Sequence, residues 1–168
     1  MTFDIGEYVV YGHSGVCRIE EKVTREFDRQ KHDYFLLKLV PDNNSTLFVP
    51  CDNEILLSNM RYPLTRDEID SLLSEVDEQR VEWIEDKRER GSYFRTIMQD
   101  GNPKQLLQTI RCIYLKKQEL INKNKALPGA DEKMLQDCER LISNEFSFVL
   151  GIETGKVSEY IAAVIQKS

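Results

Sequence analysis

The sequence has few of the residues that mark metalloproteins and disulfide-rich proteins. Only four cysteines and two histidines occur among its 168 residues, and no Cys-x-x-Cys pair is present. A structural zinc site needs closely spaced ligands, so we expect no metal and no cofactor. Buried, reduced thiols are the better interpretation, and three of them lie within strand or helix patterns where a small apolar side chain packs well: Cys17, Cys112 and Cys138.

The sequence also lacks long apolar runs and catalytic motifs. No run is long enough to span a bilayer, and the first residues have neither the basic start nor the apolar stretch of an export signal. We therefore expect a cytoplasmic protein with no membrane segment. There is no Gly-x-Ser-x-Gly elbow, no phosphate-binding loop and no paired His-Glu motif. His13, in a glycine-rich turn, is expected to shape that turn, so we expect a non-enzyme.

Charge is unevenly distributed along the chain. The formal net charge is -6, and residues 66–86 hold nine acidic and two basic residues. Residues 87–125 reverse this balance, with ten basic and three acidic residues. A local basic segment, and not the global charge, is what binding to a nucleic-acid backbone requires. An exposed helix face covered with solvated lysines is the alternative interpretation.

The first fifty residues have the pattern of a small antiparallel sheet. Aromatic and β-branched residues form four runs, separated by breaks at residues 12–15, 28–31 and 41–44, and a last short strand or turn follows within residues 53–62. Beyond Pro63 the hydrophobic period changes from two to 3.6. The predicted fold class is therefore α+β. A bent, Tudor-like or SH3-like sheet domain is expected over residues 1–62, and an all-α domain of about five helices over residues 63–168.

The helical part has clear start and stop signals. Thr65 begins a capping-box pattern, Gly101-Asn102-Pro103 ends one helix and starts the next, and Gly151 ends a fourth helix. A second helix is predicted from about Gln79 to Gln99, with Gly91 as a weak point. The remaining helices are predicted over residues 104–125, 130–150 and 157–165. In the third helix, the residues expected to face the core are Leu106, Leu107, Ile110, Ile113, Tyr114 and Ile121.

An ordered set of residues in the first part resembles the RNA-polymerase-interacting domain of the CarD family, which also has a counterpart in the bacterial transcription-repair coupling factor. These residues are Gly6, Val9, Val10, Tyr11, His13, Gly15, Tyr34, Leu37, Lys38, Val49 and Pro50. The helical part resembles the CarD helical domain at Gly101, Ile110, Arg111, Lys116, Lys117, Glu132, Lys133, Leu135, Leu141 and Glu145. A coupling factor would bring helicase motifs, and none is present, which favours the CarD family.

The resemblance implies a global bacterial transcription regulator. The sheet domain would bind the β subunit of RNA polymerase. The helical domain would touch promoter DNA at the upstream edge of the transcription bubble, where a tryptophan wedges at the minor groove and basic residues hold the backbone. Carboxylates around Trp83 would repel phosphates, so DNA binding is expected to be weak, non-specific and dependent on polymerase. Whether the protein activates or represses is left open.

Candidate contact residues follow from this resemblance. Those for polymerase are Arg25, Phe27 and Phe48, with a core Phe48 and a solvated Arg25 as the alternative. Those for DNA are Trp83, Lys87, Arg88, Arg90, Arg95, Lys116, Lys117 and Lys123. Trp83, Lys87 and Arg90 are spaced to share one face of the predicted second helix. Trp83 is also compatible with a core position.

A second function is also compatible with the sequence. The sheet domain would bind a partner, polymerase or another, while the helical domain engages no DNA. An exposed sheet edge is compatible with a monomer or with a weak homodimer. Association with the nucleoid is expected only through polymerase.

Overall fold

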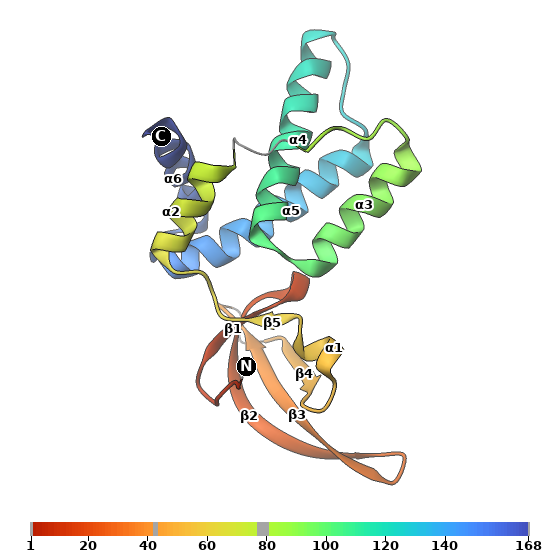
Figure 1. Ribbon diagram of the computed structural model, residues 1–168, viewed down its shortest axis with the longest axis vertical. Helices are drawn as coiled ribbons and strands as arrows, with labels where there is room; N and C mark the ends of the chain where they lie inside the picture. Colours follow the sequence, from red (N-terminus) through yellow and green to blue (C-terminus); the bar gives the residue numbers. More distant parts are fainter. Residues whose placement is uncertain (1, 42–43, 77–80, 168) are drawn as a thin grey trace. The chain divides into compact units, whose positions relative to one another are not determined.

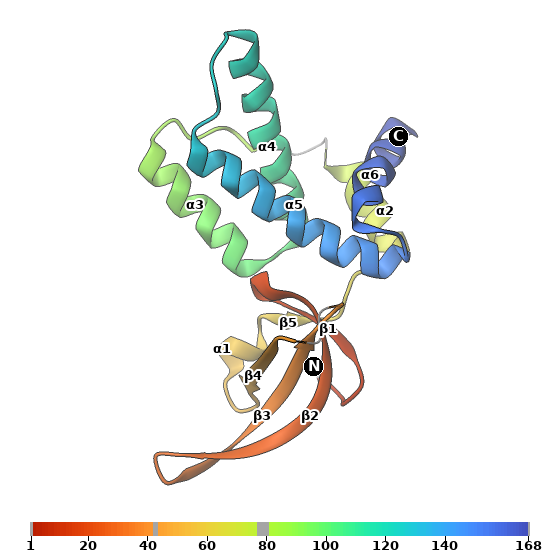
Figure 2. The ribbon, with the colours of Figure 1, turned by 180° about the vertical axis from the view of Figure 1, so that it is seen from behind.

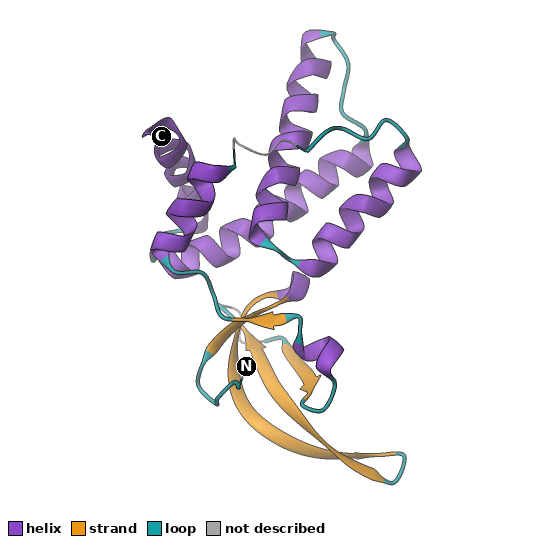
Figure 3. Ribbon diagram, viewed as in Figure 1, coloured by secondary structure: helices purple, strands orange, loops and turns teal. Residues whose placement is uncertain are grey.

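The chain folds into two compact units, Met1–Pro63 and Leu64–Ser168, each with its own hydrophobic core. The computed structural model describes residues 2–41, 44–76 and 81–167. The first unit is an antiparallel sheet and the second is helical (Figure 3). The predicted α+β class is confirmed.

The sheet has the strand order β4-β3-β2-β1-β5, and every neighbouring pair is antiparallel (Figure 1). All four predicted runs are strands. The range 53–62, where a last short strand or turn was predicted, holds the short strand β5 and, before it, the one-turn helix α1. The elements are β1 (Tyr8–Tyr11), the 3-10 turn η1 (Gly12–Ser14), β2 (Gly15–Phe27), β3 (Gln30–Leu39), β4 (Thr46–Pro50), α1 (Glu54–Leu57) and β5 (Met60–Arg61).

The long β2–β3 hairpin extends past the rest of the sheet. β1 pairs with β2 only as far as Arg18, and β4 pairs with β3 only as far as Tyr34. The hairpin closes through Asp28 and Arg29, both with positive φ (54° and 64°), which matches the twist of the flanking strands. The predicted break at 28–31 is therefore a tight turn. The predicted break at 41–44 includes residues 42–43, which lie outside the described residues.

The inner face of the sheet carries its core. Cross-strand pairs such as Val9↔Cys17 and Ile19↔Leu37 are fully buried because alternate residues of each strand point inward. A register shift between Ile19 and Glu21 marks a β-bulge in β2. Burial raises the pKa of the Cys17 thiol to about 12, so this cysteine packs as an apolar side chain, as predicted.

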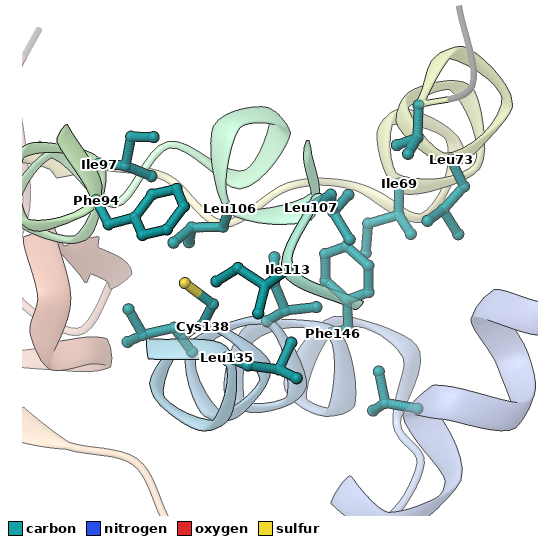
Figure 4. Close-up of a cluster of buried hydrophobic side chains, with 14 of the residues drawn as sticks. Ile69, Leu73, Phe94, Ile97, Leu106, Leu107, Ile113, Leu135, Cys138 and Phe146 are labelled. Atoms are coloured by element: carbon teal, nitrogen blue, oxygen red, sulfur yellow. The ribbon is translucent and has the colours of Figure 1, made fainter. Parts of the chain in front are cut away.

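Five α-helices and one 3-10 turn are described in the second unit. They are α2 (Arg66–Glu75), α3 (Lys87–Asp100), α4 (Pro103–Asn122), α5 (Gly129–Leu150), η2 (Thr154–Lys156) and α6 (Val157–Lys167). α5 packs against α2, α3, α4 and α6, which places it at the centre of the unit (Figure 2). Residues from each helix meet in one core, most of which is shown in Figure 4, with Phe146 and Ile113 completely buried.

The predicted helix caps are present. The Thr65 hydroxyl accepts a hydrogen bond from the Glu68 amide (3.1 Å). The Asn102 side chain accepts from the amides of Lys104 and Gln105 before Pro103 at the first turn of α4. Gly101 and Gly151 end their helices in the left-handed conformation.

The predicted start of the second helix is wrong. Residues 79–80 lie outside the described residues, residues 81–86 are not helical, and α3 begins at Lys87. The Asp86 carboxylate caps this start by accepting from the Glu89 amide (2.8 Å). Gly91 lies inside α3 and does not interrupt it. The predicted helical face shared by Trp83, Lys87 and Arg90 therefore does not exist.

Two residues expected in the core of α4 are exposed. Tyr114 and Ile121 are 52% and 49% exposed, whereas Leu106, Leu107 and Ile113 are buried as predicted. Helical spacing predicts which residues share a stripe, but the width of the covered stripe depends on which helices pack beside it.

Candidate functional site

Arg25 and Phe48 meet on the outer face of the sheet. Val49 is fully buried, so the preceding Phe48 points to the opposite face and is 46% exposed. The guanidinium carbon of Arg25 lies 5.6 Å from the centroid of the Phe48 ring, a cation–π contact. The two residues lie on β2 and β4, with β3 between them.

Tyr34 of β3 completes this group. Its ring meets Phe48 edge-on, with centroids 6.5 Å apart. The β-ladder places Tyr34 opposite Val23 and Leu36 opposite Phe48, so these residues share the outer face. We call Arg25, Tyr34 and Phe48 the outer patch. It offers a cation, a hydroxyl and aromatic surface in one place.

Two further features adjoin the outer patch. β4 is an edge strand of the sheet, so one side of it faces no other strand of the described chain. An edge of this kind can receive a strand from a partner, with main-chain hydrogen bonds giving affinity. Phe27 lies at the end of β2 beside the hairpin turn and is 70% exposed.

Trp83 lies in the non-helical segment before α3. Its side chain is partly buried and packs against the helical core. The Phe94 ring meets it edge-on at 6.4 Å, and the Arg90 guanidinium carbon lies 4.2 Å from its centroid. Lys116 Nζ lies 5.7 Å from the same centroid. The indole is thus a core-packed residue that keeps part of its surface open to solvent.

Arg90 is buried, with 4% of its surface exposed. Its Nε and Nη2 donate to the two carboxylate oxygens of Asp131 at 2.9 and 2.8 Å, which forms a bidentate ion pair between α3 and α5. Hydrogen bonding to the Asp131 carboxylate raises the pKa of the guanidinium above its ordinary value. Arg90 therefore does not belong to the exposed basic surface that the sequence predicted.

Three other predicted cations are exposed on α3. Lys87, Arg88 and Arg95 form no ion pair with any described residue. Arg88 and Arg95, seven residues apart, lie on one face of the helix with Ser92 between them. This face, which we call the α3 basic face, offers charge and a hydroxyl to an anionic partner.

The predicted lysines of α4 and of its C-cap are paired with carboxylates. Lys117 donates to Glu132 at 2.8 Å, and Lys116 and Lys123 both approach Glu119, at 3.4 and 3.3 Å. Hydrogen bonding from Lys123 and the charge of Lys116 hold the pKa of Glu119 below its usual range. These lysines therefore contribute less positive potential than their number indicates.

The described residues contain no cluster of three or more metal-ligating side chains. No helix in the described ranges is both long and apolar enough to cross a membrane.

The sheet unit matches a known domain. The family model described as the CarD-like/TRCF RID domain covers residues 3–61. This unit is therefore a RID domain of the kind that CarD-like proteins and TRCF share. RID denotes the RNA-polymerase-interacting domain, so the predicted polymerase-interacting domain is confirmed at that level. No curated protein matches the chain.

Within the RID domain, two of the three predicted contact residues lie together. Arg25 and Phe48 touch in the outer patch, and Phe27 lies farther out along the hairpin. In the helical unit, Trp83 lies with Arg90 and Lys116. The α3 basic face is a separate group of predicted residues. The functional roles of all these residues stay predictions.

The structure places at these sites two residues for which the sequence predicted no contact role. Tyr34 is part of the matching set in the RID domain, but its contact with Phe48 depends on the register between β3 and β4. Asp131 follows Arg90 by 41 residues and gave no local signal. An arginine at a helix position that faces the core does predict a buried partner of opposite charge, but it does not say which residue that partner is.

Proposed function

We propose that this protein is a CarD-like transcription regulator. The RID domain binds the β subunit of RNA polymerase, and the helical unit contacts promoter DNA near the upstream edge of the transcription bubble. The contact modulates the stability of the open complex. The match of residues 3–61 to the RID domain is the observation that carries the proposal.

The outer patch and the β4 edge supply the proposed polymerase contact. A strand of the β subunit pairs with β4, and the outer patch contacts the neighbouring side chains. The exposed Phe48 and its cation–π contact with Arg25 support this role, because aromatic residues and arginine are enriched at the centres of protein interfaces.

The proposed DNA contact uses the partly exposed Trp83 and the α3 basic face. A flat indole fits against an opened base step, while Arg88 and Arg95 attract phosphates without regard to sequence. Exposed carboxylates lie nearby, including Glu85, whose side chain is 85% exposed. Free protein therefore binds duplex DNA weakly, and polymerase delivers it to the promoter.

Co-elution with purified bacterial RNA polymerase tests the polymerase contact. We expect wild-type protein to co-elute and Arg25→Glu to co-elute less. Lys31→Glu is the matched control, because Lys31 pairs with Glu26 on the opposite face of the same hairpin. Equal binding by wild type and Arg25→Glu would remove the outer patch from the interface. No co-elution of the wild type at micromolar concentration would refute polymerase binding.

Promoter-complex lifetime tests the DNA contact. Trp83→Ala and the double variant Arg88→Glu/Arg95→Glu are expected to lose the effect of the protein on open-complex lifetime while they still co-elute with polymerase. Lys156→Glu is the control, because Lys156 is an exposed lysine whose ion pair is with Glu159 on the same helical segment. If both variants change the open-complex lifetime as much as the wild-type protein does, DNA engagement is refuted.

The pairing of the α4 lysines favours a second candidate function. If Lys116, Lys117 and Lys123 are neutralised by Glu119 and Glu132, the helical unit presents less charge to DNA. The protein would then be an adaptor that binds polymerase or another partner through the sheet and engages no DNA. Retained promoter effects in the Trp83 and α3 variants would favour this adaptor. In either case we propose that the protein acts by binding and not by catalysis.

A further inference from the structure

Trp83 is held in place by a guanidinium group. The Arg90 guanidinium carbon lies 4.2 Å from the centroid of the indole, closer than the 5.7 Å of Lys116 Nζ. Because segment 81–86 is not helical, no ladder of helical hydrogen bonds fixes the direction of the tryptophan side chain. Side-chain contacts must supply that constraint.

Arg90 also binds the backbone directly after the tryptophan. Its Nη1 donates to the carbonyl of Ile84 at 2.9 Å and to that of Glu85 at 3.2 Å. Its other two donating nitrogens are used by Asp131. With its edges bound in this way, the planar group has a fixed orientation, and one of its faces lies against the indole.

A buried ion pair of this kind adds little net stability compared with apolar residues of the same volume. It does impose one geometry, because the fork of an arginine bonds two carboxylate oxygens only in a defined plane. Asp131, on α5, therefore sets the plane of the Arg90 guanidinium on α3. That plane in turn sets the position of the loop and of the ring.

We propose that Arg90 and Asp131 are positioning residues for Trp83. They hold segment 81–86 so that the open part of the indole points in one fixed direction. What the indole meets there, an opened base step of promoter DNA, rests on the proposed function. The positioning itself does not depend on it.

Tryptophan fluorescence tests this inference directly, because Trp83 is the only tryptophan in the chain. Arg90→Lys keeps the positive charge opposite Asp131 but removes the planar stack and the fork of hydrogen bonds. We expect a red shift of the emission and stronger quenching by acrylamide, with helix content unchanged. Asp131→Asn, which removes the charge that orients Arg90, should change the spectrum in the same direction.

Two controls separate positioning from general loosening. Glu132→Gln removes the ion pair of the next residue on α5, with Lys117, and should leave the spectrum of Trp83 unchanged. Val157→Ala weakens the core at a fully buried position on α6. All measurements are made well below the unfolding midpoint of each variant. An unchanged spectrum in Arg90→Lys would overturn the proposal, and so would an equal shift in Val157→Ala.

The promoter assay separates this proposal from the proposed function. If both hold, Arg90→Lys weakens the effect on open-complex lifetime as Trp83→Ala does, while co-elution with polymerase is retained. If the spectrum moves but Trp83→Ala has no promoter effect, the positioning holds and the DNA contact fails. If Trp83→Ala has an effect and the Arg90→Lys spectrum is unchanged, the positioning fails alone.

Discussion

Asp131→Ala tests how much the helical unit depends on its buried ion pair. The side chains of Arg90 and Asp131 are 5% and 6% exposed, and their closest atoms are 2.8 Å apart. Removing the carboxylate leaves a buried guanidinium without its counter-charge. Mutations that break a buried pair in this way cost about 3–5 kcal/mol.

The neighbouring pair supplies an internal comparison. Lys117 and Glu132 are also 2.8 Å apart, but their side chains are 33% and 34% exposed. Water screens such a pair, so Glu132→Ala should cost about 0–1 kcal/mol. Asp131 and Glu132 are consecutive residues in the first turn of α5. The two substitutions therefore differ mainly in how deeply the ion pair is buried, with Arg90 in one case and with Lys117 in the other.

Urea unfolding followed by circular dichroism and by Trp83 fluorescence measures both costs. Fluorescence reports the helical unit alone, because the sheet unit contains no tryptophan. For a unit of this size, Asp131→Ala should also lower the thermal midpoint by on the order of 10–20 °C. The double variant Arg90→Met/Asp131→Leu should recover much of the loss, since no buried charge remains.

Equal costs for Asp131→Ala and Glu132→Ala would refute this reasoning. It would mean that water or a rearranged carboxylate reaches Arg90 once Asp131 is gone. A double variant no more stable than Asp131→Ala would show that the hydrogen bonds of Arg90 to the backbone, and not the unpaired charge, determine the cost.

Three further predictions concern other parts of the chain. Ellman's reagent should label Cys51 first in the native protein, because it is partly exposed, whereas burial raises the pKa of Cys17 and Cys138 to about 12 and leaves little thiolate at pH 8. Asn102→Ala should destabilise the helical unit by about 1 kcal/mol in urea unfolding, through loss of the α4 cap. Glu145→Ala should lower the free energy of unfolding by about 1–3 kcal/mol in the same assay, because the backbone amide of Leu64 loses the carboxylate oxygen that accepts from it at 2.9 Å. Glu145→Gln keeps an oxygen acceptor and should retain most of that stability.

Features set by neighbours in the sequence were predicted well. The caps at Thr65 and Asn102 depend on side-chain hydrogen bonds within three residues of the helix start, and those at Gly101 and Gly151 depend on a glycine that adopts the left-handed conformation at the helix end. The strands of the RID domain follow from short runs with intervening turns, and the RID match itself follows from the ordered residues of those strands. Local chemistry was sufficient in each case.

The start of α3 shows where local chemistry was insufficient. The helical pattern continues upstream of Lys87, so the sequence alone placed the start near residue 79. In the folded unit, Arg90 instead bonds the carbonyls of Ile84 and Glu85, and a carboxylate from α5 holds the guanidinium there. The Asp86 cap at this start is local, but the contact of Arg90 with Asp131 spans 41 residues, and no short window of the sequence contains both partners.

The sequence by itself therefore determined the fold class, the kind of N-terminal domain and the candidate residues. Only the tertiary structure decided which of those residues are available. It joins Arg25 to Phe48 across three strands, buries Arg90, and pairs Lys117 with Glu132. The physical reason is that exposure and charge pairing depend on partners from distant elements, whereas helix and strand formation depend mainly on residues a few positions away.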